Sequence, residues 1–156
     1  MIPRYRLMLV SLAATLLATH SLAFCANIDP SSDEHRYSYG ENIGWFNYLP
    51  QDGSGVTVMD KALTGFVWSE SVGWIKLDPV YGGVSHDGKG NLAGYGWSEN
   101  VGWINFSCEN TGTCDTVDFG VKIDGKNGIF SGYAWGENVG WIRFDYSGFT
   151  CLLYTS

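Results

Sequence analysis

A motif rich in glycine and aromatic residues occurs four times in this chain of 156 residues. Its copies are residues 37–48 (YSYGENIGWFNY), 65–77 (GFVWSESVGWIKL), 94–106 (GYGWSENVGWINF) and 132–144 (GYAWGENVGWIRF). The tryptophan of each second half is Trp45, Trp74, Trp103 or Trp141, so successive copies lie 29, 29 and 38 residues apart. Self-similarity at such a period is the signature of a repeat architecture. The repeat therefore constrains the fold more than any single residue does.

Each copy is typical of a β-hairpin. In the third copy Tyr95 and Trp97 stand two residues apart, so they share one face of a strand. Residues 101–106 are β-branched and aromatic, which suits a pleated surface. The Ser-Glu-Asn connection is a hairpin signal, because Asn tolerates a left-handed backbone. A glycine that fits a bulge or a close backbone approach precedes the second tryptophan: Gly44, Gly73, Gly102 or Gly140.

Short segments at 56–59, 84–86 and 117–123 predict a lead strand before each later hairpin. Three strands of about five residues fill a 29-residue repeat, whereas a propeller blade usually needs about 40 residues or more. We therefore expect one domain over residues 37–150, an antiparallel all-β repeat of about four aromatic hairpin units. A sandwich, a roll or a short solenoid is the expected arrangement, and a propeller-like one ranks second.

The first residues predict export. Arg4 and Arg6 precede an apolar run at 7–18, and small residues near Ala23 offer a cleavage point, as in a signal peptide over residues 1–23. The run is too short for a membrane span, so we expect none in the mature chain. Lipidation of Cys25 is the rival interpretation, which the bulky Phe24 disfavours. Residues 24–36 are a leader, polar from residue 27 onward, and the expected location is extracellular, at the cell surface or in the periplasm.

The last six residues, 151–156 (CLLYTS), break the style of the repeat. One back-translation of them matches a transposon-end adapter used for sequencing libraries. We interpret them as an adapter artefact, and the alternative is a genuine apolar C-terminus.

The charge excludes one class of partner. Arg4 and Arg6 account for two of the nine basic residues, so the chain after residue 26 has seven basic side chains against 16 acidic ones, a net charge of −9. Such a surface repels phosphates, and we expect no nucleic-acid partner. Aromatic residues make up 15% of the chain, which is enough to bury a core.

The insertion that lengthens the last spacing contains Cys108 and Cys114. In an exported protein, two cysteines that flank a short loop predict a disulfide. A zinc site is the rival, but it needs more ligands, and no histidine or third cysteine stands nearby.

The string W-[SG]-E-N-V-G-W-I-x-F resembles repeats of uncharacterised exported bacterial proteins, often found beside surface-anchoring or adhesion-type modules. The resemblance covers most of residues 37–146. The first copy departs from it, with Tyr39 in place of the first Trp and Phe46 in place of Ile. Terminal repeats are often atypical because they cap the stack. The resemblance implies export and implies no particular activity.

Two interpretations of the seven tryptophans remain open. They can form the core, each ring packing against the next repeat, or they can stand exposed and stack on the faces of sugars, with the repeat making the contact multivalent. Alternation allows the two tryptophans of one hairpin to lie on different faces. The candidate binding residues are Trp68, Trp97, Trp135, Tyr95 and Tyr133.

Other side chains do not predict catalysis. The turn carboxylates Glu41, Glu70, Glu99 and Glu137 recur in equivalent solvated settings, whereas an acid–base pair needs divergent environments. Asp87 and Asp124 begin glycine-rich turns, where calcium binding is a minor alternative. His35 and His86 are isolated and no catalytic triad is evident.

We therefore expect no enzyme, no cofactor and no metal. The expected function is that of an exported non-catalytic structural or interaction module at the cell surface or outside the cell. The alternative is a carbohydrate-binding module that uses exposed Trp and Tyr. The expected partner is a protein or a polysaccharide.

Overall fold

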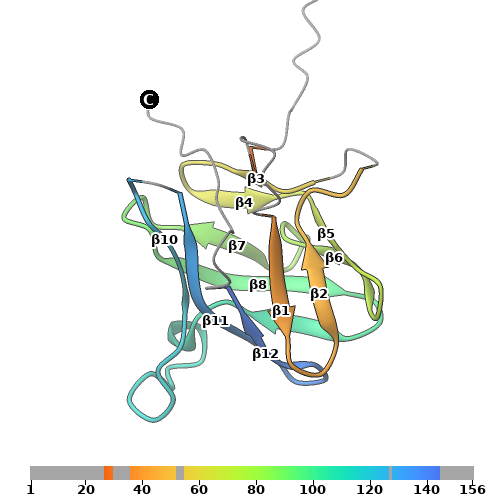
Figure 1. Ribbon diagram of the computed structural model, residues 1–156. Coiled ribbons are helices and arrows are strands. Elements are labelled where there is room, and N and C mark those ends of the chain that lie inside the picture. The colour runs from red at the N-terminus through yellow and green to blue at the C-terminus, as the bar shows by residue number, and fades with distance from the viewer. Residues whose placement is uncertain (1–26, 30–35, 52–54, 127, 145–156) are drawn as a thin grey trace, which may run out of the picture.

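The computed structural model describes residues 27–29, 36–51, 55–126 and 128–144 (Figure 1). The predicted signal peptide and residues 151–156 lie outside the described residues, as does most of the leader. The strands are β1 (Tyr37–Gly40), β2 (Gly44–Asn47), β3 (Thr57–Val58), β4 (Ala62–Thr64), β5 (Phe66–Ser69), β6 (Gly73–Lys76), β7 (Gly83–His86), β8 (Leu92–Ser98), β9 (Gly102–Asn105), β10 (Val121–Ile123), β11 (Phe130–Gly136) and β12 (Gly140–Arg143). A 3-10 helix, η1 (Cys108–Asn110), follows β9. The antiparallel all-β prediction is confirmed.

Four hairpins close into an eight-stranded barrel. The hairpins are β1–β2, β5–β6, β8–β9 and β11–β12, one from each copy of the motif. Each hairpin pairs with the next, β2 with β5, β6 with β8 and β9 with β11, and β12 returns to β1 (Figure 1). This closed barrel differs from the sandwich, roll, short solenoid or propeller that the sequence predicts.

The register explains why the sheet closes. Within a hairpin the two tryptophan positions face each other, as Trp97 faces Trp103. At the junction with the next hairpin it is Asn105, two residues beyond Trp103, that faces Trp135. The same shift of two residues occurs at all four junctions. The total shift around the barrel is therefore eight residues. Such a cumulative stagger tilts the strands and closes an eight-stranded barrel.

The barrel interior is filled by side chains from equivalent positions of the four hairpins. The second arms contribute Phe46, Ile75, Ile104 and Ile142, and the residues just beyond them contribute Tyr48, Leu77, Phe106 and Phe144. The first arms contribute the smaller Ser38, Val67, Gly96 and Ala134. An eight-stranded barrel has an interior just wide enough for such a filling. Each fully buried aliphatic side chain contributes about 1.5–3 kcal/mol.

The remaining strands extend the barrel at the end opposite the hairpin turns. β7 pairs with the first half of β8, β10 pairs with the first half of β11, and β4 lies between β3 and β7. Within β8, Gly94 has φ +92°. A β-carbon there would overlap the carbonyl oxygen of Gly83 on β7, so the two strands approach too closely for any side chain. The lead strands thus lie near their predicted segments, as β3, β7 and β10.

Asparagines in the hairpin turns join neighbouring hairpins by hydrogen bonds at the turn end of the barrel. Asn100 Nδ2 donates to the carbonyl of Val72 at 2.9 Å. Asn138 and Asn42 make the same bond to Val101 and Val139, at 3.0 and 3.2 Å. In the second hairpin Ser71 stands in place of the asparagine. The glycine that ends each turn has φ between 75° and 80°, which explains its place before the second tryptophan.

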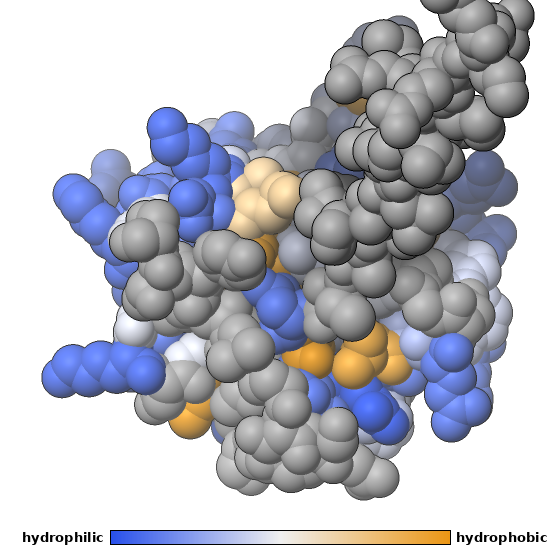
Figure 2. Space-filling model, turned by 90° about the horizontal axis from the view of Figure 1, so that it is seen from above, coloured by the Kyte–Doolittle hydropathy of each residue, from blue (hydrophilic) through white to orange (hydrophobic). Residues whose placement is uncertain are grey.

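Seen from above, the described surface is mainly hydrophilic, with only small separate hydrophobic patches (Figure 2). Within the described ranges, no helix has the length and apolar character needed to cross a membrane.

Candidate functional site

The tryptophans lie on the outer face of the barrel. Five of them are 36–48% exposed, Trp45, Trp74, Trp97, Trp103 and Trp135, and the other two are half-buried. The interpretation of these rings as the core is therefore wrong. Along each arm they alternate with the side chains that fill the barrel, because successive residues of a strand point to opposite faces.

The two tryptophans of one hairpin share a face. Trp97 and Trp103 are cross-strand partners with ring centroids 4.7 Å apart. A third ring, Tyr95, meets Trp103 edge-on at 6.1 Å. The other hairpins repeat this arrangement. The expectation that the two rings can lie on different faces is wrong, because directly paired positions always point to the same side of a sheet.

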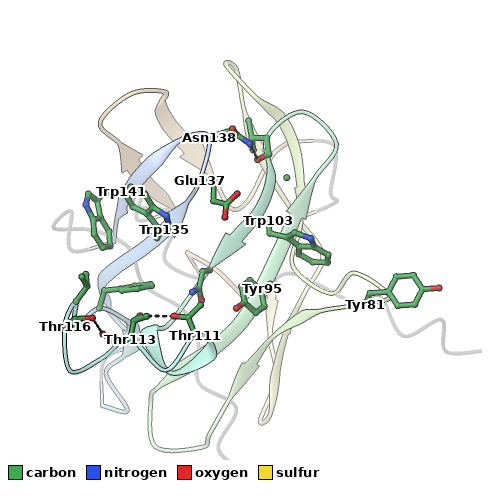
Figure 3. A pocket seen from close by; sticks show the side chains of 15 residues that line it. Tyr81, Tyr95, Trp103, Thr111, Thr113, Thr116, Trp135, Glu137, Asn138 and Trp141 are labelled. Carbon is green, nitrogen blue, oxygen red and sulfur yellow. Dashed lines mark hydrogen bonds between the residues drawn. The ribbon is translucent and has the colours of Figure 1, made fainter.

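A groove of about 990 Å³ runs between the third and fourth hairpins (Figure 3). We call it the β9–β11 groove. Trp103 stands on one side and Trp135 on the other, with Glu137 between them in this view. The residues that line it are Tyr81, Tyr95, Val101, Gly102, Trp103, Asn105, Thr111, Thr113, Thr116, Val117, Phe119, Trp135, Glu137, Asn138 and Trp141. The groove exists because the register shift separates the rings of neighbouring hairpins.

Asn105 presents a fixed donor to this groove. The residue is only 7% exposed. Its Oδ1 accepts hydrogen bonds from the Ser107 backbone N–H at 3.1 Å and from Asn110 Nδ2. Its Nδ2 makes no hydrogen bond to any described residue, and neither do the indole nitrogens of Trp103 and Trp135. A buried amide held by its oxygen, with its N–H groups unused, is a ready donor for a ligand.

The disulfide loop forms a further wall. Cys108 and Cys114 are bonded, with Cα atoms 5.0 Å apart, so the predicted disulfide is confirmed. Asn110 fastens this loop to β8: its Oδ1 accepts from Gly94 N–H and its Nδ2 donates to Gly94 O, both at 2.9 Å. The loop thereby brings the hydroxyls of Thr111 and Thr113, which are hydrogen-bonded to each other, to the groove.

The rival zinc interpretation of these cysteines does not fit their bonding. The carboxylate of Asp118 lies within 4.8 Å of both sulfur atoms. The two sulfurs are bonded to each other, however, and zinc binds the thiolate form of cysteine.

Polar groups elsewhere have structural roles. The buried Tyr48 hydroxyl lies 3.1 Å from the Ser38 hydroxyl, and burial raises the pKa of Tyr48 above its ordinary range. Asp87 accepts hydrogen bonds from the Asn91 side chain and from the backbone of Lys89 and Asn91, which lower its pKa to about 2. These groups stabilise a core contact and a turn.

The predicted binding residues fall into three places. Tyr95 and Trp135 line the β9–β11 groove, and Trp68 lines a second groove between β2 and β5. Trp97 and Tyr133 are exposed on the outer face but line neither groove.

Sequence reasoning missed Trp103 and Asn105. Alignment of the four copies could have drawn attention to Asn105, because its position varies between copies. Lys76 and Arg143 occupy it in two of the others.

A comparison with known proteins finds no family model, no curated protein and no solved structure that matches the chain.

Proposed function

We propose that this protein is a non-catalytic binding module that holds a neutral polysaccharide in the β9–β11 groove. The observation that carries the proposal is the outward placement of the tryptophans, with Trp103 and Trp135 on the two sides of one open groove. Export and a place at the cell surface are part of the same proposal, and they rest on the N-terminal sequence.

The rings suit the faces of a pyranose. A sugar ring carries partly positive C–H groups on its faces, and an aromatic ring is partly negative on its face. Trp135 is 37% exposed and Trp103 is 41% exposed, so each ring keeps area for such a contact. Equatorially linked chains, such as β-1,4-glucans, expose these C–H faces continuously and can lie along an open groove.

The polar groups suit sugar hydroxyls. A hydroxyl both donates and accepts, so a sugar site needs both kinds of partner at its edge. Asn105 offers its free Nδ2 donor, and Glu137 offers a carboxylate that makes no hydrogen bond to a described residue. Thr111 and Thr113 add hydroxyls at the wall.

The charge favours a neutral ligand. The chain carries a net charge of −7, and such a surface opposes the approach of an anionic polymer. In support of a non-catalytic role, Glu137 is the single carboxylate among the described residues that line the groove. Hydrolysis of a glycosidic bond ordinarily needs two carboxyl groups that flank it.

Calorimetric titration of the full-length, non-reduced protein tests the proposal. The probes are β-1,4-linked hexaoses of glucose, mannose, xylose and N-acetylglucosamine, with an oligogalacturonate as the anionic comparison. We expect one or more neutral hexaoses to bind and the oligogalacturonate to remain unbound. Loss of the ring removes its apolar contact with the sugar, so Trp135→Ala should weaken binding in this groove by about tenfold or more.

Trp74→Ala is the matched control. Trp74 has a similar exposure, 39% against 37%, and a similar ring partner, Trp68 at 4.8 Å, but it does not line the β9–β11 groove. It should cost as much stability as Trp135→Ala and leave the affinity of this groove unchanged. The proposal is wrong if no neutral hexaose binds, or if both variants weaken binding equally.

A further inference from the structure

A second groove repeats the first at eight equivalent positions. It lies between β2 and β5, has a volume of about 600 Å³, and we call it the β2–β5 groove. Its lining is Tyr37, Ile43, Gly44, Trp45, Asn47, Trp68, Glu70 and Ser71. The equivalent residues of the β9–β11 groove are Tyr95, Val101, Gly102, Trp103, Asn105, Trp135, Glu137 and Asn138. At these equivalent positions, both grooves share two tryptophans, a tyrosine, an asparagine and a glutamate.

The asparagine of the second groove is held in the same way as that of the first. Asn47 Oδ1 accepts from the Leu49 backbone N–H at 2.9 Å, as Asn105 Oδ1 accepts from Ser107 at 3.1 Å. In each case the donor of the amide, Nδ2, makes no hydrogen bond within the described part of the chain. The same local turn thus fixes a free amide donor in both grooves.

The two intervening junctions carry a different residue. Lys76 takes the place of the asparagine between β6 and β8, and Arg143 takes it between β12 and β1. Lys76 extends along the outer face, with its Nζ 5.8 Å from the centroid of the Phe66 ring. A long cation on a flexible stem replaces the short amide fixed by its own backbone. The junctions therefore alternate around the barrel between an asparagine and a basic residue.

The alternation places the two asparagine grooves on opposite sides of the barrel. In the closed strand order, the β2–β5 and β9–β11 junctions are two junctions apart in either direction. From this arrangement we infer that the β2–β5 groove is a second site for the same class of neutral polysaccharide, so that one chain of this protein joins two polysaccharide chains. This inference rests on the proposed function of the first groove.

Opposed sites favour cross-linking over tighter binding of one chain. Two linked sites raise the apparent affinity only when one ligand can reach both, and an extended polysaccharide cannot pass around the barrel to the opposite groove. We therefore expect each groove to bind a hexaose about as well as it binds the same segment of a long polymer. The additional property of the pair is that it holds two polymer chains together.

Calorimetric stoichiometry with the four neutral hexaoses tests the second site. The full-length, non-reduced protein should bind two hexaoses per chain. Trp68→Ala should weaken one site beyond the range of the titration and Trp135→Ala the other, so the double variant should show no measurable binding. Asn47→Lys is a second variant for the β2–β5 groove. It leaves every ring pair in place and introduces the residue that the fold already holds at Lys76, so it should also reduce the stoichiometry to one.

Light scattering measures the cross-linking. If the glucose hexaose binds, the polymer used is hydroxyethyl cellulose. The wild-type protein should cluster the polymer, and each single variant should bind it without clustering.

The outcomes separate the two proposals. A stoichiometry of one that is lost in Trp135→Ala and unchanged in Trp68→Ala and Asn47→Lys overturns the second site and leaves the proposed function in place. A stoichiometry of two without clustering of the polymer overturns the cross-linking role. If no hexaose binds, or if the folded double variant still binds with the wild-type stoichiometry, both proposals are wrong.

Discussion

Trp97 and Trp103 face each other across β8 and β9 on the outside of the barrel, with their ring centroids 4.7 Å apart. The pair is solvated on its outer side, since Trp97 is 36% and Trp103 is 41% exposed. The same relationship in the neighbouring hairpins surrounds the barrel with paired rings. A surface of this kind stabilises each hairpin and at the same time leaves aromatic area for a ligand.

Substitution of an outer ring should cost less stability than substitution of an inner one. Trp97→Ala removes the cross-strand pair with Trp103 and the contact between their rings. Together these losses should lower the free energy of unfolding by about 1–2 kcal/mol. Phe46→Ala empties a position that is 1% exposed, and it should cost about 3–5 kcal/mol. Urea unfolding of the two variants measures the difference. Equal losses would contradict the assignment of inner and outer faces.

The chain of turn asparagines should contribute to closure of the barrel. Asn100→Ala removes the 2.9 Å bond to the Val72 carbonyl and should lower the free energy of unfolding by about 1 kcal/mol. Ser71→Asn supplies the missing donor in the second hairpin and should raise it by about 0.5–1.5 kcal/mol. Thermal unfolding measures both effects. Glu99→Ala, in the same turn as Asn100, is the control and should change little; a loss equal to that of Asn100→Ala would mean that the bond itself contributes nothing.

Gly94 should tolerate no side chain. Gly94→Ala places a β-carbon against the Gly83 carbonyl at a φ of +92°, and it should cost more than about 2 kcal/mol. Gly125→Ala is the matched control, because a β-carbon there meets nothing within 4 Å and φ is not positive. Chemical unfolding compares the pair. A stable Gly94→Ala protein would show that β7 and β8 do not approach closely at Gly94.

The hairpins could be predicted from sequence, and the faces of their side chains could not. Alternation shows that Tyr95 and Trp97 share a face, but it does not show which face is the core. Large rings suggest burial, yet here the interior holds Ile104 and Gly96 together with smaller rings such as Phe106, and the tryptophans lie outside. The choice depends on the diameter of the barrel, which follows from the pairing between hairpins.

The groove was hidden for a related reason. Asn105 and Trp135 are 30 residues apart in sequence, and only the register between β9 and β11 brings them together. The disulfide was accessible to sequence reasoning because Cys108 and Cys114 are close neighbours along the chain. Local features could be predicted, and features that depend on pairing between repeats could not.

Asp87 should make a pH-dependent contribution to stability. Hydrogen bonds from Asn91 and Lys89 lower its pKa to about 2 in the folded protein. A carboxyl group whose pKa is lowered by folding stabilises the folded state above its ordinary pKa, and this contribution is lost as the pH falls through the folded value. The difference in unfolding midpoint between wild type and Asp87→Ala should therefore be present at neutral pH and vanish near pH 2.

Asp115→Ala is the control for this effect, because Asp115 is exposed and forms no hydrogen bond with the described residues. It should show little difference from the wild type at either pH. A difference for Asp87→Ala that stays constant down to the acid limit would contradict the role of the ionised carboxylate.

The most direct test of the central claim is to follow the seven indole N–H signals by NMR while a neutral β-1,4-linked hexaose is added to the full-length protein. Single Trp→Phe variants assign the signals. We predict that the signals of Trp103 and Trp135 shift with one saturation curve, that those of Trp45 and Trp68 shift with a second, and that those of Trp74 and Trp97 stay in place. If none of the hexaoses moves any indole signal, or if the signals of Trp74 and Trp97 alone respond, the grooves are not the binding sites.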